Sequence, residues 1–245
     1  MKRLRVGLLA TILGVASVFA VSSARADGYR APAYAAPAMP NWTGLYMGVH
    51  AGGAWSQVDW ADVSLTGEPV TNDGGGFIGG AQVGYNFQFG SIVAGAEATI
   101  SGSTIEANAA SAVAPATITY TTDIHSIATA TGRLGVAFDR VLVYAKGGWA
   151  GARVAVSGVD TLLPDAFTIN EWRSGWTVGG GAELRLSPSM SVGVEYSYID
   201  LGNQSYASTT FTAIPYTITD HDVQIQSVTA RLNFKLQREE YVPLK

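Results

Sequence analysis

Strict two-residue alternation of side-chain character is the feature that most constrains this chain. In segment 75–90, apolar residues such as Phe77, Val83 and Phe87 share one parity, and glycine, glutamine and asparagine hold the other. A period of two predicts strands. Eight such segments follow Trp42 and predict an all-β fold: 43–55, 75–90, 92–103, 124–138, 141–155, 174–187, 189–201 and 222–236.

The connections between these segments alternate in length. Tight connections follow the second, fourth and sixth segments at 90–91, 139–140 and 187–189. Long connections follow the others, at 56–74, 104–123, 156–173 and 202–221. Short turns at one end and long loops at the other are typical of bacterial outer-membrane barrels. The pattern predicts an eight-stranded antiparallel up-and-down transmembrane β-barrel with both termini in the periplasm.

Charged residues are scarce and sit on the polar parity of the strands. They make up 14% of the chain, against about 25% in an average soluble domain. Small residues mixed with a few charges favour a narrow lumen over a surface in bulk water. Two roles stay open for these side chains, a structural network or the selectivity of a small-solute pore. The set comprises Glu97, Arg133, Lys146, Glu183, Arg185, Glu195 and Arg231.

Aromatic residues gather at two levels of the apolar parity. This banding predicts two membrane-interface girdles, and it favours a membrane barrel over a secreted barrel with an apolar cavity. The short-turn level holds Phe87, Phe89, Phe138 and Phe234, and the long-loop level holds Trp55, Phe77, Trp149, Trp176 and Tyr198.

Two irregularities interrupt the alternation. Gly147 and Gly148 are adjacent within the fifth segment and predict a β-bulge. Val223 and Ile225 are out of phase with the apolar residues that follow them in the last segment. We expect this early part of the last segment to stand above the bilayer.

The ends of the chain predict export. Lys2, Arg3 and Arg5 precede an apolar stretch that ends in a small-residue cleavage site at 24–26, so residues 1–26 are expected to be a signal peptide. Residues 27–41 are rich in proline and alanine and predict a periplasmic linker. The barrel is expected to span 42–236, followed by a periplasmic tail at 237–245.

Several function classes are disfavoured by composition. The chain has no cysteine and a formal net charge of −4, which argues against thiolate sites and against a nucleic-acid partner. The three histidines show no metal-ligand spacing. His125 and Ser126 are adjacent on a strand and therefore point to opposite faces. We expect no enzyme activity, no metal and no cofactor.

Ordered motifs resemble one family. They are NWTGLY at 41–46, GAQVGYN at 80–86, TGRLG at 131–135, YAKGG at 144–148 and GVEY at 193–196. The chain is similar to the small outer-membrane β-barrel or porin-family proteins of alpha-proteobacteria, which include surface antigens and haemin-binding members. In such proteins a terminal aromatic residue is read by the barrel-assembly machinery, whereas Leu236 stands at that position here.

The resemblance implies a structural and surface-antigen role in the outer membrane. It also implies outer-membrane lipid, lipopolysaccharide and the barrel-assembly machinery as partners. The alternatives are a small-solute channel and a receptor for haemin or a host ligand. Candidate haem ligands in the loops and at their rim are His125, His221 and Tyr216.

Overall fold

The computed structural model describes residues 41–62, 69–110, 118–160, 165–202, 204–211 and 214–236. No helix among them is long and apolar enough to cross a membrane. Except for Asn41, the predicted signal peptide, linker and tail lie outside this part of the chain. The described residues form nine strands: β1 (Gly44–Asp62), β2 (Pro69–Phe89), β3 (Ile92–Ala110), β4 (Ile118–Phe138), β5 (Val141–Asp160), β6 (Asp165–Ser187), β7 (Met190–Asp200), β8 (Gln204–Phe211) and β9 (Ile214–Lys235).

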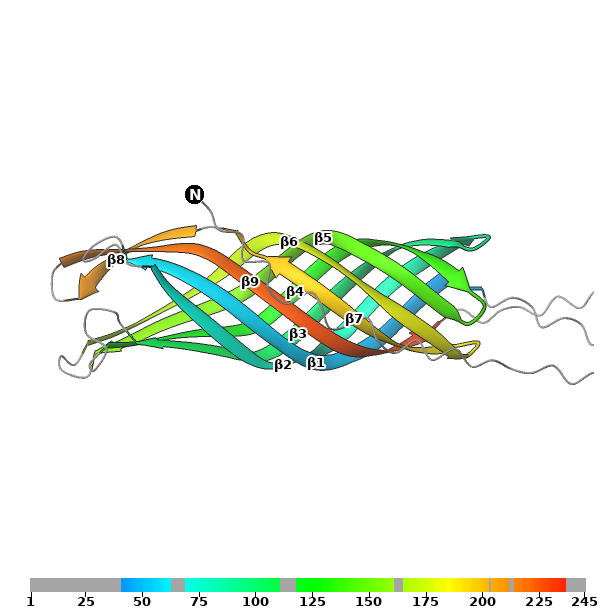
Figure 1. The fold of residues 1–245 in the computed structure, drawn as a ribbon, viewed down its shortest axis with the longest axis horizontal. Helices are drawn as coiled ribbons and strands as arrows, with labels where there is room; N and C mark the ends of the chain where they lie inside the picture. The colour runs from blue at the N-terminus through cyan, green and yellow to red at the C-terminus, as the bar shows by residue number, and fades with distance from the viewer. Residues whose placement is uncertain are drawn as a thin grey trace, which may run out of the picture. The chain divides into compact units, whose positions relative to one another are not determined.

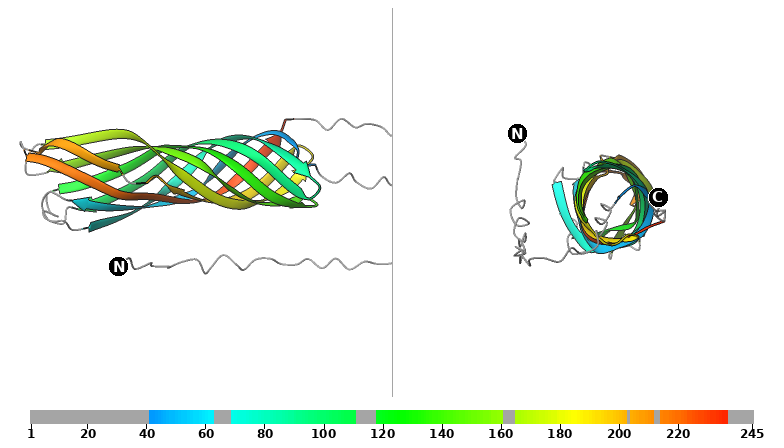
Figure 2. Two further views of the ribbon diagram at one scale, coloured as in Figure 1. Left: turned by 90° about the horizontal axis from the view of Figure 1, so that it is seen from above. Right: turned by 90° about the vertical axis from the view of Figure 1, so that its right-hand side faces the viewer.

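The strands close into a barrel. Strands β1 to β7 pair antiparallel in chain order, and β9 pairs with both β7 and β1. Strand β7 lies against residues 224–234 of β9, and β8 lies against residues 214–220. Strands β7 and β8 therefore share one position in the wall, which confirms the predicted eight-stranded antiparallel barrel (Figures 1 and 2).

Tight turns join the strands at one end of the barrel, as predicted, at 90–91, 139–140 and 188–189. Gly90 adopts a φ of +63° and Asp139 a φ of +51°. Glycine carries no Cβ to clash in this left-handed region, and aspartate is among the few other residues that tolerate it. These two residues set the tight hairpins that fix the neighbouring registers.

The connections at the other end are shorter than predicted. Strands β1 to β6 and β9 run well into the segments expected as loops, so the boundaries predicted at 56–74, 104–123, 156–173 and 202–221 are wrong. The physical reason is that an antiparallel ladder satisfies backbone hydrogen-bonding groups in water as well as in lipid. Segments such as 118–122, rich in threonine and tyrosine, have high strand propensity.

The predicted bulge is also misplaced. Gly147 and Gly148 keep continuous register with both neighbouring strands. The register shifts instead between Ile124 and Ser126 of β4, and between Gly102 and Ile105 of β3. An extra residue in a strand shifts the alternation of side chains by one position, so that two side chains three positions apart can both point into the lumen. Ile124 and Ile127 are three positions apart, yet both are buried.

Candidate functional site: the barrel lumen

All seven charged residues predicted for the lumen lie on the inward faces of their strands. Each is buried, between 3% and 8% exposed. Their alternation with exposed apolar neighbours follows from the pleat, which sends successive side chains to opposite faces. Six of the seven converge on one layer, whereas Arg185 lies apart from them. The layer holds three carboxylates and three cations: Glu97, Glu183, Glu195, Arg133, Lys146 and Arg231.

Glu97 is the centre of this charged layer. Its Oε2 lies 3.6 Å from Arg133 Nη1 and also pairs with Arg231 Nη2, while its Oε1 lies 3.4 Å from Lys146 Nζ. The Tyr46 hydroxyl donates a hydrogen bond of 2.8 Å to Oε2. One carboxylate from β3 is thus held by side chains from β1, β4, β5 and β9.

The other two carboxylates complete the layer. Glu195 Oε1 lies 2.6 Å from Lys146 Nζ, and its Oε2 pairs with Arg231 Nη1. Glu183 Oε1 accepts a bond of 2.9 Å from Arg133 Nη2, and Ser191 Oγ donates to its Oε2 at 3.1 Å. Each cation therefore joins two carboxylates.

Two tyrosines that the sequence reasoning overlooked connect the ion pairs. Tyr46 accepts a 2.8 Å bond from Arg133 Nη1, and Tyr144 accepts a 3.1 Å bond from Arg231 Nη1. Tyr144 in turn donates to Glu195 Oε2 at 2.7 Å. The Arg133 guanidinium also lies 4.0 Å from the centre of the Tyr144 ring, a cation–π arrangement. Their lumen parity was the available signal, because it placed both tyrosines inside.

Equal numbers of opposite charges fit a packed interior. A buried charge without a partner costs several kcal/mol, whereas paired and hydrogen-bonded charges are tolerated. Two cavities among the described lumen residues are small, about 30 Å³ beside Glu183 and about 40 Å³ beside Lys146. The cavity beside Lys146 has room for one to a few water molecules but is too small for a solute to pass through it.

A hydrogen-bonded group lies next to the charged layer. His50 Nδ1 is 2.8 Å from Gln82 Oε1, and His50 Nε2 is 2.9 Å from Ser101 Oγ. Gln82 Nε2 also donates to Asn233 Oδ1 at 2.7 Å. These bonds join β1, β2, β3 and β9 across the lumen. His50 is a structural side chain in this arrangement.

A second, apolar layer fills the lumen toward the long hairpins, and the sequence reasoning missed it. Val223 and Ile225, expected above the bilayer, lie inside the barrel with no exposed area. They share inward parity with Arg231, which was the available signal and explains why they are out of phase with the apolar residues that follow. The level of this segment relative to the bilayer stays a prediction. The layer comprises Ala54, Ile78, Ile105, Ile124, Ile127, Ala150, Ala152, Val154, Ile199, Leu201, Val223 and Ile225.

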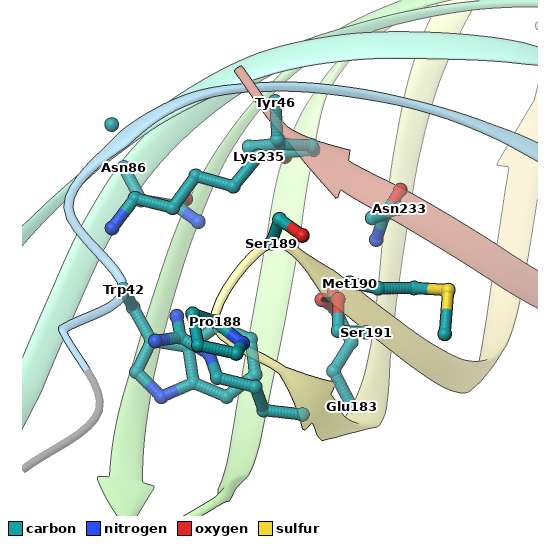
Figure 3. Close-up of a pocket in the computed structure, with 12 residues that line it drawn as sticks. Trp42, Tyr46, Asn86, Glu183, Pro188, Ser189, Met190, Ser191, Asn233 and Lys235 are labelled. Carbon is teal, nitrogen blue, oxygen red and sulfur yellow. Dashed lines mark hydrogen bonds between the residues drawn. The ribbon is translucent and has the colours of Figure 1, made fainter. Parts of the chain in front are cut away.

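The short-turn end of the lumen is covered by residues that precede β1. Trp42 is 5% exposed and packs with Val93, Leu142 and Tyr144. The Arg185 guanidinium lies 4.4 Å from the centre of the Trp42 ring, and its Nη2 donates to the Asn41 carbonyl at 2.9 Å. Figure 3 shows Trp42 beside the pocket at this end. Arg185 therefore holds this cover in place.

The predicted girdle residues lie on the outer wall. Eight of the nine are at least 40% exposed, from Trp55 at 40% to Phe77 at 77%, and Tyr198 is half-buried. An apolar outer wall around a polar and packed interior is the arrangement of a barrel in lipid.

The haem-ligand candidates are only partly visible. His125 is exposed on β4 at the register shift. The side chains of His221 and Tyr216 lie outside the described residues, so haemin binding stays a prediction. Among the described residues, no group of three or more histidine or acidic side chains lies close enough to hold a metal ion.

Comparisons with known proteins agree with this architecture. Residues 13–230 match the model of the family described as "Outer membrane protein beta-barrel domain". The "31 kDa outer-membrane immunogenic protein" of Brucella melitensis biotype 1 is 30% identical over 241 residues, which cover 91% of this chain and 98% of that protein. The "25 kDa outer-membrane immunogenic protein" of Brucella abortus biovar 1 is 28% identical over 177 residues, which cover 72% and 73%.

The fold also matches a solved structure. The crystal structure of the outer membrane protein OprG from Pseudomonas aeruginosa aligns with a TM-score of 0.52 at 11% identity, over 82% of this chain and 99% of that one. At this identity the likeness shows the fold alone. Together with the family match and the 30% identical relative, it leads to one conclusion: the chain belongs to the outer membrane protein β-barrel domain family and is an outer-membrane β-barrel protein.

Proposed function

We propose that this protein is a closed, non-conducting barrel that anchors in the outer membrane and holds its long hairpins at the cell surface. The observation that carries the proposal is the double filling of the lumen. In the charged layer around Glu97 each charge has a partner of opposite sign, and the apolar layer around Ile225 is buried. A narrow eight-stranded barrel filled in this way supports a structural role.

A conductance measurement tests the closed lumen. The protein purified from outer membranes, with its fold checked by heat-dependent gel migration, is reconstituted in planar bilayers. We expect no reproducible current steps. Regular steps would contradict the proposal and favour the small-solute channel. In that case Arg133→Glu should change the preference between cations and anions, because Arg133 contacts two carboxylates of the lumen.

The proposal includes an orientation, with both termini and the short turns in the periplasm. The absence of cysteine from the chain makes this testable by single-cysteine labelling. Asp73 lies near the long-hairpin end of β2, and Arg140 lies in a short turn, so Asp73→Cys and Arg140→Cys report on the two ends of the barrel. A membrane-impermeant maleimide should label the first on intact cells and the second only after permeabilisation. The reverse pattern would contradict the orientation.

The surface hairpins give the protein its proposed role as an antigen. The two Brucella relatives are named immunogenic proteins, and we extend that property to this chain. Antibodies raised against the folded protein should bind intact cells. Binding that appears only after permeabilisation would contradict surface display, even if the barrel proved closed.

A further inference from the structure

One sector of the outer wall carries a concentrated aromatic surface. Trp149 on β5 stands opposite Trp176 on β6 in the strand register. The Trp149 and Trp172 rings are stacked, with centroids 6.5 Å apart and an interplanar angle of 26°. The Trp176 and Tyr198 centroids are 5.6 Å apart. The three tryptophans are 42% to 48% exposed, so their rings lie along the wall and still face outward.

Gly151 makes room for the stacked pair. A Cβ at this position would come within 2.7 Å of the Trp172 ring and 2.8 Å of the Trp149 ring. Real Cβ atoms do not approach other atoms so closely, and any larger residue would push the rings from the wall. Gly151 is buried beneath them. The backbone is therefore shaped to hold this surface.

A cation stands directly beyond the aromatic surface. Trp149, Gly151 and Arg153 are two residues apart along β5 and so share its outward face. Arg153 is exposed and stands opposite Trp172 in the register. On the other side it pairs with Ser126, the neighbour of exposed His125. Tryptophan prefers the membrane interface, and an arginine just past it lies at headgroup level.

We propose that this surface, formed by Trp149, Trp172 and Arg153, binds the phosphorylated glycolipid headgroup of the outer leaflet, the lipid A part of lipopolysaccharide. The Arg153 guanidinium would take a phosphate through two parallel hydrogen bonds. The exposed indole faces would pack against the C–H faces of a sugar ring. Headgroup level at the long-hairpin end is the outer leaflet only in the proposed orientation, so this inference rests on the proposed function.

Carboxylates stand at the same end on both sides of this surface: Asp73, Glu106 and Asp123 on β2, β3 and β4, and Glu171 and Asp200 on β6 and β7. Arg153 is the exposed cation beside the stacked indoles of β5 and β6. The geometry therefore places one phosphate contact and one sugar platform side by side.

Native mass spectrometry of the purified, delipidated protein in detergent tests the site. Diphosphoryl lipid A, dephosphorylated lipid A and phosphatidylglycerol are titrated separately. Diphosphoryl lipid A should bind best. Arg153→Gln should weaken it about fivefold, the contribution of one cation near an anionic membrane surface. Arg140→Gln removes a cation at the short-turn end and serves as the matched control, with no change expected.

Trp172→Leu tests the aromatic part of the site. It should weaken the binding of both diphosphoryl and dephosphorylated lipid A. Trp172→Phe should keep most of the binding, and heat-dependent migration shows that each variant is folded. Equal binding of phosphatidylglycerol, or unchanged binding by Arg153→Gln, would overturn the proposal. Binding in detergent does not depend on orientation, so a reversed labelling pattern on cells would contradict the proposed function without changing this result.

Discussion

The two layers of the lumen fill the same cylinder by opposite means. Around Glu97, single polar side chains from different strands meet through directional bonds, and each strand supplies only one or two of them. Around Ile225, the layer consists mainly of branched and small apolar residues, with the buried Arg173 opposite Ala152 in the register. The comparison teaches that one lumen combines a specific layer, which tolerates few changes, with a layer in which volume matters most.

The largest effect is expected from the centre of the charged layer. Glu97→Gln leaves Arg133, Lys146 and Arg231 sharing one carboxylate fewer. Removing one partner of a buried ion pair costs about 3–5 kcal/mol, so the free energy of unfolding should fall by about 4 kcal/mol. Urea unfolding in lipid vesicles, followed by tryptophan fluorescence, measures it. Asp73→Asn, an exposed carboxylate, is the control. Equal loss in both variants would mean that the charged layer adds no special stability.

A somewhat smaller loss is expected in the apolar layer. Ile225 has no exposed area, so Ile225→Ala should lower the free energy of unfolding by about 3 kcal/mol through lost burial and a new cavity. Ile225→Val should cost about 1 kcal/mol. The same urea unfolding measures both. A loss below 1 kcal/mol for the alanine variant would show that this side chain is not packed inside the barrel.

The two layers should differ in how far the effects of paired substitutions on the free energy of unfolding depart from additivity. Arg133 and Glu183 form a 2.9 Å pair, so Arg133→Met and Glu183→Gln together should cost about 2 kcal/mol less than the sum of the single losses. Ile124→Ala and Ile225→Ala, combined in the same way, should deviate less from additivity. A double-mutant cycle of unfolding free energies gives both values. Additive losses at Arg133 and Glu183 would contradict a directional layer.

The smallest effect is expected beside the charged layer. Ser101→Ala leaves His50 Nε2 without its 2.9 Å partner and should cost about 1 kcal/mol. Ser103→Ala removes an identical hydroxyl from the same strand, one that donates to the backbone carbonyl of Ile124 instead of a side chain, and serves as the comparison. If Ser101→Ala lowered the free energy of unfolding as much as Glu97→Gln does, His50 would have to be counted as part of the charged layer.

Sequence reasoning reached the charged layer but not the apolar one, and the reason is physical. Parity places Glu97, Arg133 and Arg231 inside as long as register is unbroken. Parity also places Val223 and Ile225 inside, but apolar residues were expected on the outer face. Among the apolar-layer residues that the structure describes, only Ile124 is displaced in parity, by the extra residue between Ile124 and Ser126. The shared tyrosine hydroxyls escaped because pairing across a lumen depends on strand tilt and stagger, which local sequence does not specify.

The length of the strands toward the long hairpins was underestimated because the sequence signal for a strand weakens there. Apolar alternation marks the part of a strand in lipid, and it fades along the sequence beyond that part. Strands β4 and β6 continue through such segments because their ladders need only backbone partners. The seven predicted lumen charges and the nine predicted girdle aromatics lie on the faces that parity assigned to them.

The pairing of β1 with β9 has a consequence for how the chain folds. The contact between Arg231 and Glu97 joins residues 134 positions apart, and Tyr46 reaches the same carboxylate from the first strand. Such long loops must close before these contacts repay their entropy, so folding is expected to be slow. Until the last strand docks, three carboxylates and three cations face water on an unclosed sheet. Because a buried charge without its partner is costly, the pairing of these charges and the closure of the barrel are expected to occur together.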